Sequence, residues 1–250
     1  MTAFITRDLS DNSVFKSLLT ARGWQVEGRS LVILTPLVFH EIPAAGWIFF
    51  SSKNAVRFFF QNIENQKLAM PSVKWAALGE ATAEMLKKYV GEPDFTGNGD
   101  PGATAEAFLR QPHPRPLPRR DGSTAQGTLY VSPPVGGGVG GGVVLFPAAR
   151  HVRESMMSLL SARFQCIHLE VYDNKPVGAP PASDADVLVF TNPMNAEAYF
   201  VQHVLQNKQQ VVAIGRTTAE ALKALGIDGI FISDEPSERS LADAVLRLQR

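Results

Sequence analysis

The sequence has a single cysteine, Cys166, among 250 residues. One thiol cannot form an intramolecular disulfide or supply a cysteine-rich metal site, and a lone buried thiol is typical of a cytoplasmic protein. No apolar run approaches the about 18 residues that a membrane-spanning helix needs. Residues 1–8 also lack the apolar core of a signal peptide. We therefore expect a cytoplasmic protein that has no contact with the membrane.

An excess of charge of one sign is also missing. The 24 basic and 24 acidic residues give a formal net charge of zero, so the composition does not indicate a nucleic-acid-binding protein. Apolar residues make up 45% of the chain, which is enough for a substantial core. The length suits one large domain or two small ones. A monomer is the default expectation for the oligomeric state.

Common catalytic motifs are absent as well. The sequence contains no phosphate-binding Walker A loop, no G-x-S-x-G nucleophile turn and no H-E-x-x-H zinc motif. The five histidines show no spacing typical of metal ligands, and no pair of carboxylates suggests acid–base chemistry. A G-x-G-x-x-G match at Gly97, Gly99 and Gly102 lacks a buried strand directly before it, so we do not assign it to a dinucleotide. We expect neither a metal nor a cofactor.

Residues 111–142 differ in composition from the rest of the chain. This window holds six prolines and eight glycines. Proline removes backbone donors, and glycine raises the entropic cost of ordering the chain. We therefore predict a low-complexity insertion loop that forms no packed helix or strand.

Outside that window, short apolar runs alternate with amphipathic runs. Such continuous apolar strands separated by helices favour parallel sheets that are covered on both faces. The expected strands are residues 3–6, 31–39 (broken by Pro36), 47–50, 143–146, 187–190 and 211–214.

Two segments recur in the same order in each half of the chain. FFSSKNAVRFFFQN (49–62) matches VFTNPMNAEAYFVQH (189–203), and WAALGEATAEMLKKY (75–89) matches VVAIGRTTAEALKALG (211–226). One supersecondary unit used twice is the simplest explanation. The fold class we predict is α/β, with two flavodoxin-like parallel-sheet domains. We expect the carboxyl ends of their strands to face each other across a ligand-binding cleft.

Small or polar residues follow the strands of both repeats, at the predicted helix starts. Backbone N–H groups at such positions attract anions, aided by the helix dipole. Ordinary N-capping is the alternative for each residue alone. Several such turns at one cleft favour a polycarboxylate ligand. The residues are Ser51, Ser52, Asn54, Gly79 and Thr82 in the first repeat, and Thr191, Asn192, Asn195, Gly215, Thr217 and Thr218 in the second.

Taken together, these motifs resemble the uroporphyrinogen-III synthase family. The similarity covers nearly the whole chain except residues 111–142, and it depends on the order and spacing of several individually weak motifs. They are FITR (4–7), FFSSKNAVRFF (49–59), AALGEATAEML (76–86), LEVYDNKP (169–176), VLVFTNPMNAEAYF (187–200) and VVAIGRTTAEALKALG (211–226).

The resemblance implies a fold of two α/β domains joined by a two-stranded linker. One domain is discontinuous and comprises residues 1–35 plus 173–250, and the other comprises residues 38–168. The linker strands correspond to about 32–39 and 166–176.

The resemblance also implies an activity, that of a hydro-lyase. Family members close hydroxymethylbilane, a linear tetrapyrrole polycarboxylate, to uroporphyrinogen III, with loss of water and inversion of the terminal pyrrole ring. Departure of the hydroxyl gives an electrophilic azafulvene, and attack by the substituted carbon of the terminal ring gives a spiro intermediate that fragments and recloses. No metal or organic cofactor takes part. A transient contact with the preceding enzyme of the pathway is a further implication.

Site residues follow from the same resemblance. Tyr172 matches a tyrosine of the family that acts as general acid. A phenol with a pKa near 10 is protonated at neutral pH and can therefore donate a proton. The alternative is a linker tyrosine that only packs. Where relatives often carry Arg-Gly after the strand at 143–146, this chain has Ala148-Ala149-Arg150. The substrate-binding residues that the resemblance implies are Arg7, Ser51, Thr82, Thr191, Thr217 and Thr218. The repeated turns add Ser52, Asn54, Gly79, Asn192 and Gly215 to the predicted binding site.

Two other functions remain open at this point. The same scaffold could serve as a non-catalytic two-domain binding or regulatory protein that holds an acidic small molecule without turnover. The chain could also be an inactive paralogue that is disabled by the insertion at 111–142.

Overall fold

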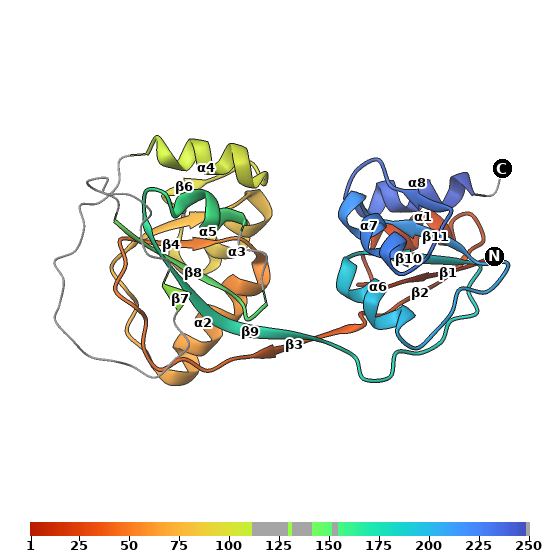
Figure 1. Ribbon diagram of the computed structural model, residues 1–250, viewed down its shortest axis with the longest axis horizontal. Helices are drawn as coiled ribbons and strands as arrows, with labels where there is room; N and C mark the ends of the chain where they lie inside the picture. The colour runs from red at the N-terminus through yellow and green to blue at the C-terminus, as the bar shows by residue number, and fades with distance from the viewer. Residues whose placement is uncertain (112–129, 132–141, 152–154, 249–250) are drawn as a thin grey trace. The chain divides into compact units, whose positions relative to one another are not determined.

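The computed structural model describes residues 1–111, 130–131, 142–151 and 155–248 (Figure 1). Its chain divides into two compact units, which we call unit 1 (Met1–Ile33 with Lys175–Arg250) and unit 2 (Leu34–Asn174). No helix within the described residues is both long enough and apolar enough to cross a membrane.

Two neighbouring strands carry the chain from one unit to the other, as the two-stranded linker predicts. They are β3 (Val32–Pro36) and β9 (Gln165–Pro176). The strand β3 ends at Pro36, three residues before the predicted end, because proline has no N–H to donate to a neighbouring strand.

Unit 1 contains a five-stranded sheet of order β12-β11-β10-β1-β2, in which every neighbouring pair is parallel. The order confirms a flavodoxin-like arrangement, because the strands that follow β10 extend the sheet in the direction opposite to β2. Its elements are β1 (Thr2–Ile5), α1 (Val14–Thr20), β2 (Gln25–Gly28), β10 (Val187–Phe190), α6 (Pro193–Phe200), β11 (Gln210–Ala213), α7 (Arg216–Ala224), β12 (Ile230–Ile232) and α8 (Glu238–Arg247).

Unit 2 is also built on a mostly parallel sheet, but its strand order differs from the flavodoxin-like order of unit 1, because β5 and β6 lie on one side of β4 while β8 and β9 lie on the other. Its sheet order is β3-β9-β8-β4-β5-β6, and the pairs from β9 to β6 are all parallel. The elements besides β3 and β9 are β4 (Trp47–Phe50), α2 (Lys53–Gln66), β5 (Lys74–Ala77), α3 (Glu80–Val90), β6 (Phe95–Thr96), α4 (Pro101–Leu109), β7 (Tyr130–Val131), β8 (Val143–Ala149) and α5 (Ser155–Leu160).

The central strands are apolar on both faces, as parallel strands between two helical layers must be. In β4 all four residues are buried, and they alternate between two cores because successive strand side chains point to opposite faces. Ile48 and Phe50 enter one core, and Trp47 and Phe49 enter the other. Unit 1 is divided in the same way, with Phe4 on one face of β1 and its neighbours on the opposite face.

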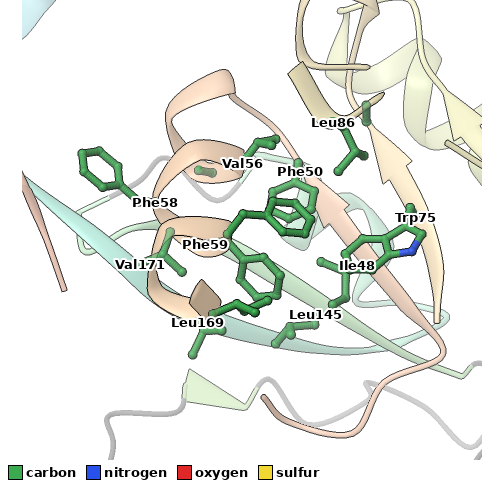
Figure 2. Packing of buried hydrophobic residues seen from close by; sticks show 14 of the residues in the cluster. Ile48, Phe50, Val56, Phe58, Phe59, Trp75, Leu86, Leu145, Leu169 and Val171 are labelled. Atoms are coloured by element: carbon green, nitrogen blue, oxygen red, sulfur yellow. The ribbon is translucent and has the colours of Figure 1, made fainter. Parts of the chain in front are cut away.

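Aromatic rings dominate the core beneath α2 (Figure 2). Phe59 meets Phe50 edge to face at 5.4 Å between ring centroids, and it stacks on Phe39 at 5.5 Å. Trp75 lies beside both Phe50 and Phe60. Truncating a buried aromatic residue of this kind to alanine typically costs about 3–5 kcal/mol. This core therefore fixes α2, and with it the turn between β4 and α2.

Two sequence predictions prove wrong here. Most of the predicted loop at 111–142 lies outside the described residues, but Tyr130–Val131 form β7, which pairs antiparallel with β9. Tyrosine and valine are residues that favour strands, and they interrupt the low-complexity composition. The G-x-G-x-x-G segment does follow a strand, β6, whose two residues are too short a run to recognise in the sequence.

Candidate active site

Some of the predicted site residues of unit 1, among them Arg7 and Thr191, lie where the strand order reverses, whereas Gly215, Thr217 and Thr218 do not line the cavity there. The chain leaves β1 toward β2 on one side and leaves β10 toward β11 on the other, and ligands of such sheets bind at this reversal. A cavity of about 360 Å³ lies there, within unit 1. Its lining residues are Thr6, Arg7, Asp8, Ser30, Thr191, Asn192, Asn195 and Ile214.

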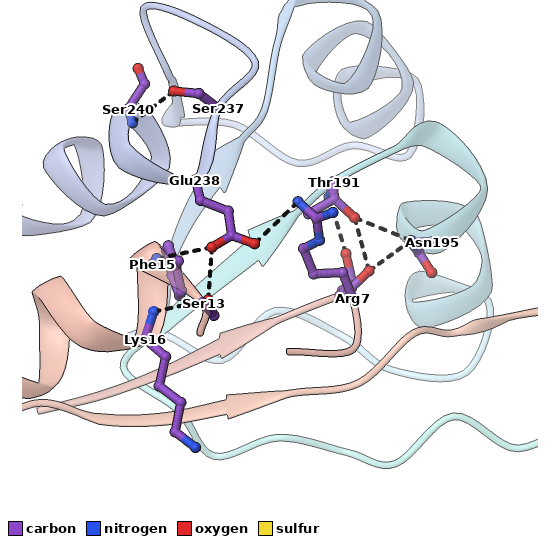
Figure 3. A network of polar contacts seen from close by, with 10 residues as sticks. Arg7, Ser13, Phe15, Lys16, Thr191, Asn195, Ser237, Glu238 and Ser240 are labelled. Atoms are coloured by element: carbon purple, nitrogen blue, oxygen red, sulfur yellow. Dashed lines mark hydrogen bonds and ion pairs between the residues drawn. The ribbon is translucent and has the colours of Figure 1, made fainter. Parts of the chain in front are cut away.

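A network of hydrogen bonds fixes the wall of this cavity (Figure 3). The Thr191 hydroxyl donates to the Thr6 carbonyl at 2.9 Å, and the Thr191 N–H donates to the Thr6 hydroxyl at 3.1 Å. The buried Asn195 amide also donates to the Thr6 carbonyl, at 2.8 Å, and its Oδ1 accepts from the Leu31 N–H at 2.9 Å. Thr191 therefore uses both polar groups within unit 1, where they hold the ends of β1 and β10 together.

Arg7 lines the same cavity and pairs with Glu238 at 3.8 Å (Figure 3). The Glu238 Oε2 accepts from the Ser13 hydroxyl at 2.8 Å and from the Phe15 N–H at 3.1 Å. Although burial opposes its charged form, these hydrogen bonds and the Arg7 charge hold the pKa of Glu238 below its ordinary value. The carboxylate thus stays charged and keeps the partly exposed guanidinium near the cavity.

The four repeated turns are of two kinds. At α2 and α6 a side chain closes the helix start, because Ser52 accepts from the Ala55 N–H at 3.1 Å and Asn192 accepts from the Asn195 N–H at 2.8 Å. Pro193 removes a further donor from α6.

The helix starts at α3 and α7 differ from those two. They begin at Gly79 and Gly215, and no side chain caps them among the described residues. No atom lies within 4 Å of where a Cβ on Gly215 would stand. Open N–H groups at a helix start suit an anionic ligand. The α3 and α7 turns therefore fit carboxylate binding better than the α2 and α6 turns do.

The remaining predicted binding residues lie on these same turns. Thr82 and Thr218 are both buried in the first turn of their helices, and Thr217 is exposed. Ser51 and Asn54 are half-buried on either side of the α2 cap. Aligned on the two caps, Asn54 corresponds to Met194. Asn195 therefore lies one position further into its helix than Asn54 does, although the turn between strand and helix has two residues in both repeats.

In unit 2 the structure brings Tyr172 and Ser52 together, although 119 positions separate them in the sequence. Tyr172 lies on β9, is 8% exposed and stacks on Phe58 of α2 with 5.1 Å between ring centroids. The Ser52 side chain acts on this phenol and lowers its pKa. The Arg57 guanidinium lies over the ring of Phe58, 4.4 Å from its centroid.

Burial raises the pKa of the Tyr172 phenol above its ordinary value, while the Ser52 side chain and the charge of Arg57 act in the opposite direction. The phenol is therefore protonated throughout the neutral range and can donate a proton. No group of three or more histidine, cysteine, aspartate or glutamate side chains that could hold a metal ion occurs in the described part of the chain.

Some residues at the strand ends were missed by the sequence reasoning. Asp8 and Ser30 line the unit 1 cavity. Asp8 lies two residues after the predicted strand 3–6, whereas Ser30 follows β2, a strand that the sequence did not predict. In unit 2, Arg150 pairs with Glu170 at 2.9 Å and with Asp173 at 3.5 Å, beside Tyr172. That cluster depends on the register between β8 and β9, which no local pattern reveals.

Two solved structures share this fold. The uroporphyrinogen-III synthetase of Helicobacter pylori matches with a TM-score of 0.64 at 18% identity, over 99% of each chain. A mutant uroporphyrinogen III synthase of the extremely thermophilic bacterium Thermus thermophilus matches with a TM-score of 0.58 at 16% identity, over 100% of this chain and 99% of the other. At such identities the likeness shows the two-domain fold.

The family is shown by the sequence itself. The family model for uroporphyrinogen-III synthase HemD matches residues 13–115 and 133–243, which is most of the chain. The chain therefore belongs to the uroporphyrinogen-III synthase family, whose members are enzymes of tetrapyrrole biosynthesis.

Proposed function

We propose that this protein is a uroporphyrinogen-III synthase that closes hydroxymethylbilane to uroporphyrinogen III, with Tyr172 as the proton donor. The phenol donates its proton to the departing hydroxyl, which leaves as water. The resulting azafulvene reacts through the spiro intermediate, and the proton returns to the phenolate when the rearranged ring closes and regains aromaticity. The bilane closes to the type I isomer without an enzyme, so most of the catalysis lies in holding the conformation that favours the spiro route.

The observation that carries this proposal is the environment of Tyr172. Tyr172 is buried and stacked on Phe58, and the side chain of Ser52, in the turn after β4, acts on its phenol. Burial raises the pKa of the phenol, so its neutral form is available as an acid at every physiological pH.

Substrate binding is assigned to the strand-end turns of both units. The open N–H groups at Gly79 and Gly215 hold substrate carboxylates, and the Arg7 guanidinium binds another. The remaining proposed contacts are Ser51, Ser52, Asn54, Thr82, Thr191, Asn192, Thr217 and Thr218. Binding through backbone amides explains how a chain of zero net charge could hold a polyanion.

The proposal includes the cellular setting. We assign the protein to the cytoplasm, as a monomer that works without metal or cofactor. Because hydroxymethylbilane closes spontaneously, a transient contact with the enzyme that releases it would limit the loss to the type I isomer.

The test supplies freshly prepared hydroxymethylbilane and separates the isomers formed with and without the protein. The proposal predicts mostly type III product with the protein and type I product without it. A second arm measures binding of uroporphyrinogen III by the quenching of tryptophan fluorescence. Binding without turnover by folded protein would replace the synthase with a non-catalytic polycarboxylate-binding protein.

A further inference from the structure

The pairing of β8 with β9 contains an irregularity directly before Tyr172. Ala148 is paired with Glu170, but the next residue, Ala149, is paired with Tyr172. Val171 is therefore an extra residue on β9, which is a β-bulge. Bulges of this kind occur beside active sites, where they redirect a side chain.

The bulge changes the face on which Tyr172 lies. In a regular strand, neighbouring side chains point to opposite faces. Here Leu169 and Val171 lie beneath α2 (Figure 2), and Tyr172 belongs to the same core cluster. The extra residue thus brings the phenol to the face where Phe58 and Ser52 lie. Without it, Tyr172 would point to the opposite face of the sheet.

Arg150 holds the strand on both sides of this bulge. Its backbone N–H donates to the Tyr172 carbonyl at 2.9 Å. Its Nε donates to the Glu170 Oε2 at 2.9 Å, and its Nη1 lies 3.5 Å from the Asp173 Oδ2. One residue therefore contacts Tyr172 and two residues that flank it. Asp173 is only 2% exposed, and a buried carboxylate needs such a cation nearby.

Arg150 and Arg7 differ in what they leave for a ligand. Arg7 follows β1 and Arg150 follows β8, and each of these strands lies at the point where the strand order of its sheet reverses. Among the described residues, Arg7 makes one ion pair, at 3.8 Å, and lines a cavity. Arg150 has two carboxylate partners on β9, one of them at hydrogen-bonding distance. This arrangement suits support of the strand rather than capture of a substrate carboxylate.

We propose that Arg150 is a positioning residue, which together with the bulge at Val171 holds the Tyr172 phenol at the angle required for proton donation. This inference rests on the proposed function of Tyr172. Arg150 does not itself touch the reacting atoms. It fixes the backbone and the two side chains around the acid, so that its removal lets the phenol rotate away from Ser52 and from the substrate.

The test is a double-mutant cycle. Arg150→Met is expected to lower kcat by about tenfold to a hundredfold, the range typical of a misplaced catalytic group, with KM changed by less than about twofold. In the Tyr172→Phe background the same substitution should change kcat by less than about twofold, because it acts only through the phenol. An equal loss of kcat in both backgrounds, or a raised KM in both, would overturn the inference.

Two further variants keep the test decisive if Arg150→Met folds poorly. Arg150→Lys retains the charge but not the forked geometry, and should recover part of kcat. Arg150→Met with Asp173→Asn removes the buried charge together with its partner, and should fold while keeping the low kcat. Arg247→Met is the matched control, because it breaks a 2.6 Å ion pair with Asp234 in unit 1 and should leave kcat unchanged.

A spectroscopic readout separates this inference from the function of Tyr172. In protein labelled with ¹³C at tyrosine Cζ, the Tyr172 resonance, assigned from Tyr172→Phe, reports the titration of the phenol. Arg150→Met is expected to shift both its chemical shift and its titration midpoint. If Tyr172→Phe retains full kcat, the proposed acid role fails, and an unchanged Tyr172 resonance in Arg150→Met overturns the positioning role separately.

Discussion

Gly79 and Gly99 are in backbone contact, so that a Cβ on Gly79 would lie 2.9 Å from the Gly99 Cα. The Gly99 N–H donates to the Leu78 carbonyl at 2.8 Å, which presses the β6–α4 turn against the start of α3. Gly99 has a φ of +92°, a conformation that favours glycine. Two glycines are therefore required where these turns meet, and neither requirement involves a ligand.

This contact gives the first prediction, for two equivalent glycines. Gly79→Ala should lower the free energy of unfolding by about 1–3 kcal/mol, because the methyl group meets backbone that cannot yield. Gly215→Ala should change it by less than about 0.5 kcal/mol, because open space surrounds that position. Gly215→Ala should instead raise KM, since the methyl group enters the proposed carboxylate site. Urea denaturation and steady-state kinetics measure both effects; a Gly215→Ala variant with wild-type KM would contradict the binding assignment.

Tyr172→Phe should lower kcat by about a hundredfold, within the range for loss of a general acid, without changing KM much. Type III should remain the main enzymatic isomer, because the conformation of the substrate is held by other groups. Tyr89→Phe is the matched control, since Tyr89 is exposed on α3. Equal kcat values in the two variants would show that the Tyr172 hydroxyl does not take part in the reaction.

The action of Ser52 on Tyr172 predicts a pH effect. Because the Ser52 side chain lowers the pKa of Tyr172, Ser52→Ala should raise that pKa further. The acid form then persists to higher pH, so the alkaline decline of kcat should move upward. Ser237→Ala is the control, because it removes the serine cap of α8 and should leave the alkaline decline of kcat at the wild-type pH. A downward shift in Ser52→Ala would mean that the Ser52 side chain does not lower the pKa of the phenol.

Glu238 predicts how stability depends on pH. Its pKa is lowered in the folded protein, so its contribution to stability is present above the unfolded pKa and is lost as the pH falls through the folded pKa. The stability difference between the wild type and Glu238→Gln should therefore shrink in acid. Urea denaturation between pH 7 and about pH 3 measures it. A constant difference over that range would show that the Glu238 charge does not contribute.

Cys166 should be inert while the protein is folded. It is fully buried, and burial raises the pKa of its thiol to about 12, so the reactive thiolate is scarce at pH 8. A thiol reagent such as dithionitrobenzoate should react only after denaturant is added. Rapid stoichiometric reaction of the thiol in native buffer would contradict the burial of the Cys166 side chain.

Much of the fold could be predicted because its signals are local. Four consecutive buried residues in β4 and the repeated strand–turn–helix segments indicated parallel sheets and two related units. The short strands β6 and β7 were missed because two residues give no periodicity. Thr217 and Thr218 were chosen from their place after β11, and their role in binding stays a prediction.

The contacts around Tyr172 could not be predicted in the same way. The interaction with Ser52 joins distant parts of the chain, and the orientation of the phenol depends on the extra residue Val171 in β9. A one-residue change of register alters the face on which a side chain lies, and no local pattern reports it. For the same reason Arg150 could be noticed in the sequence but not given a role.

The most direct test of the synthase assignment is the fraction of type III isomer formed from fresh hydroxymethylbilane, sampled before spontaneous closure is complete. The wild-type protein should convert the bilane mostly to type III, faster than the bilane closes alone. Type I product at the spontaneous rate, from protein shown to be folded by its circular dichroism, would contradict the assignment.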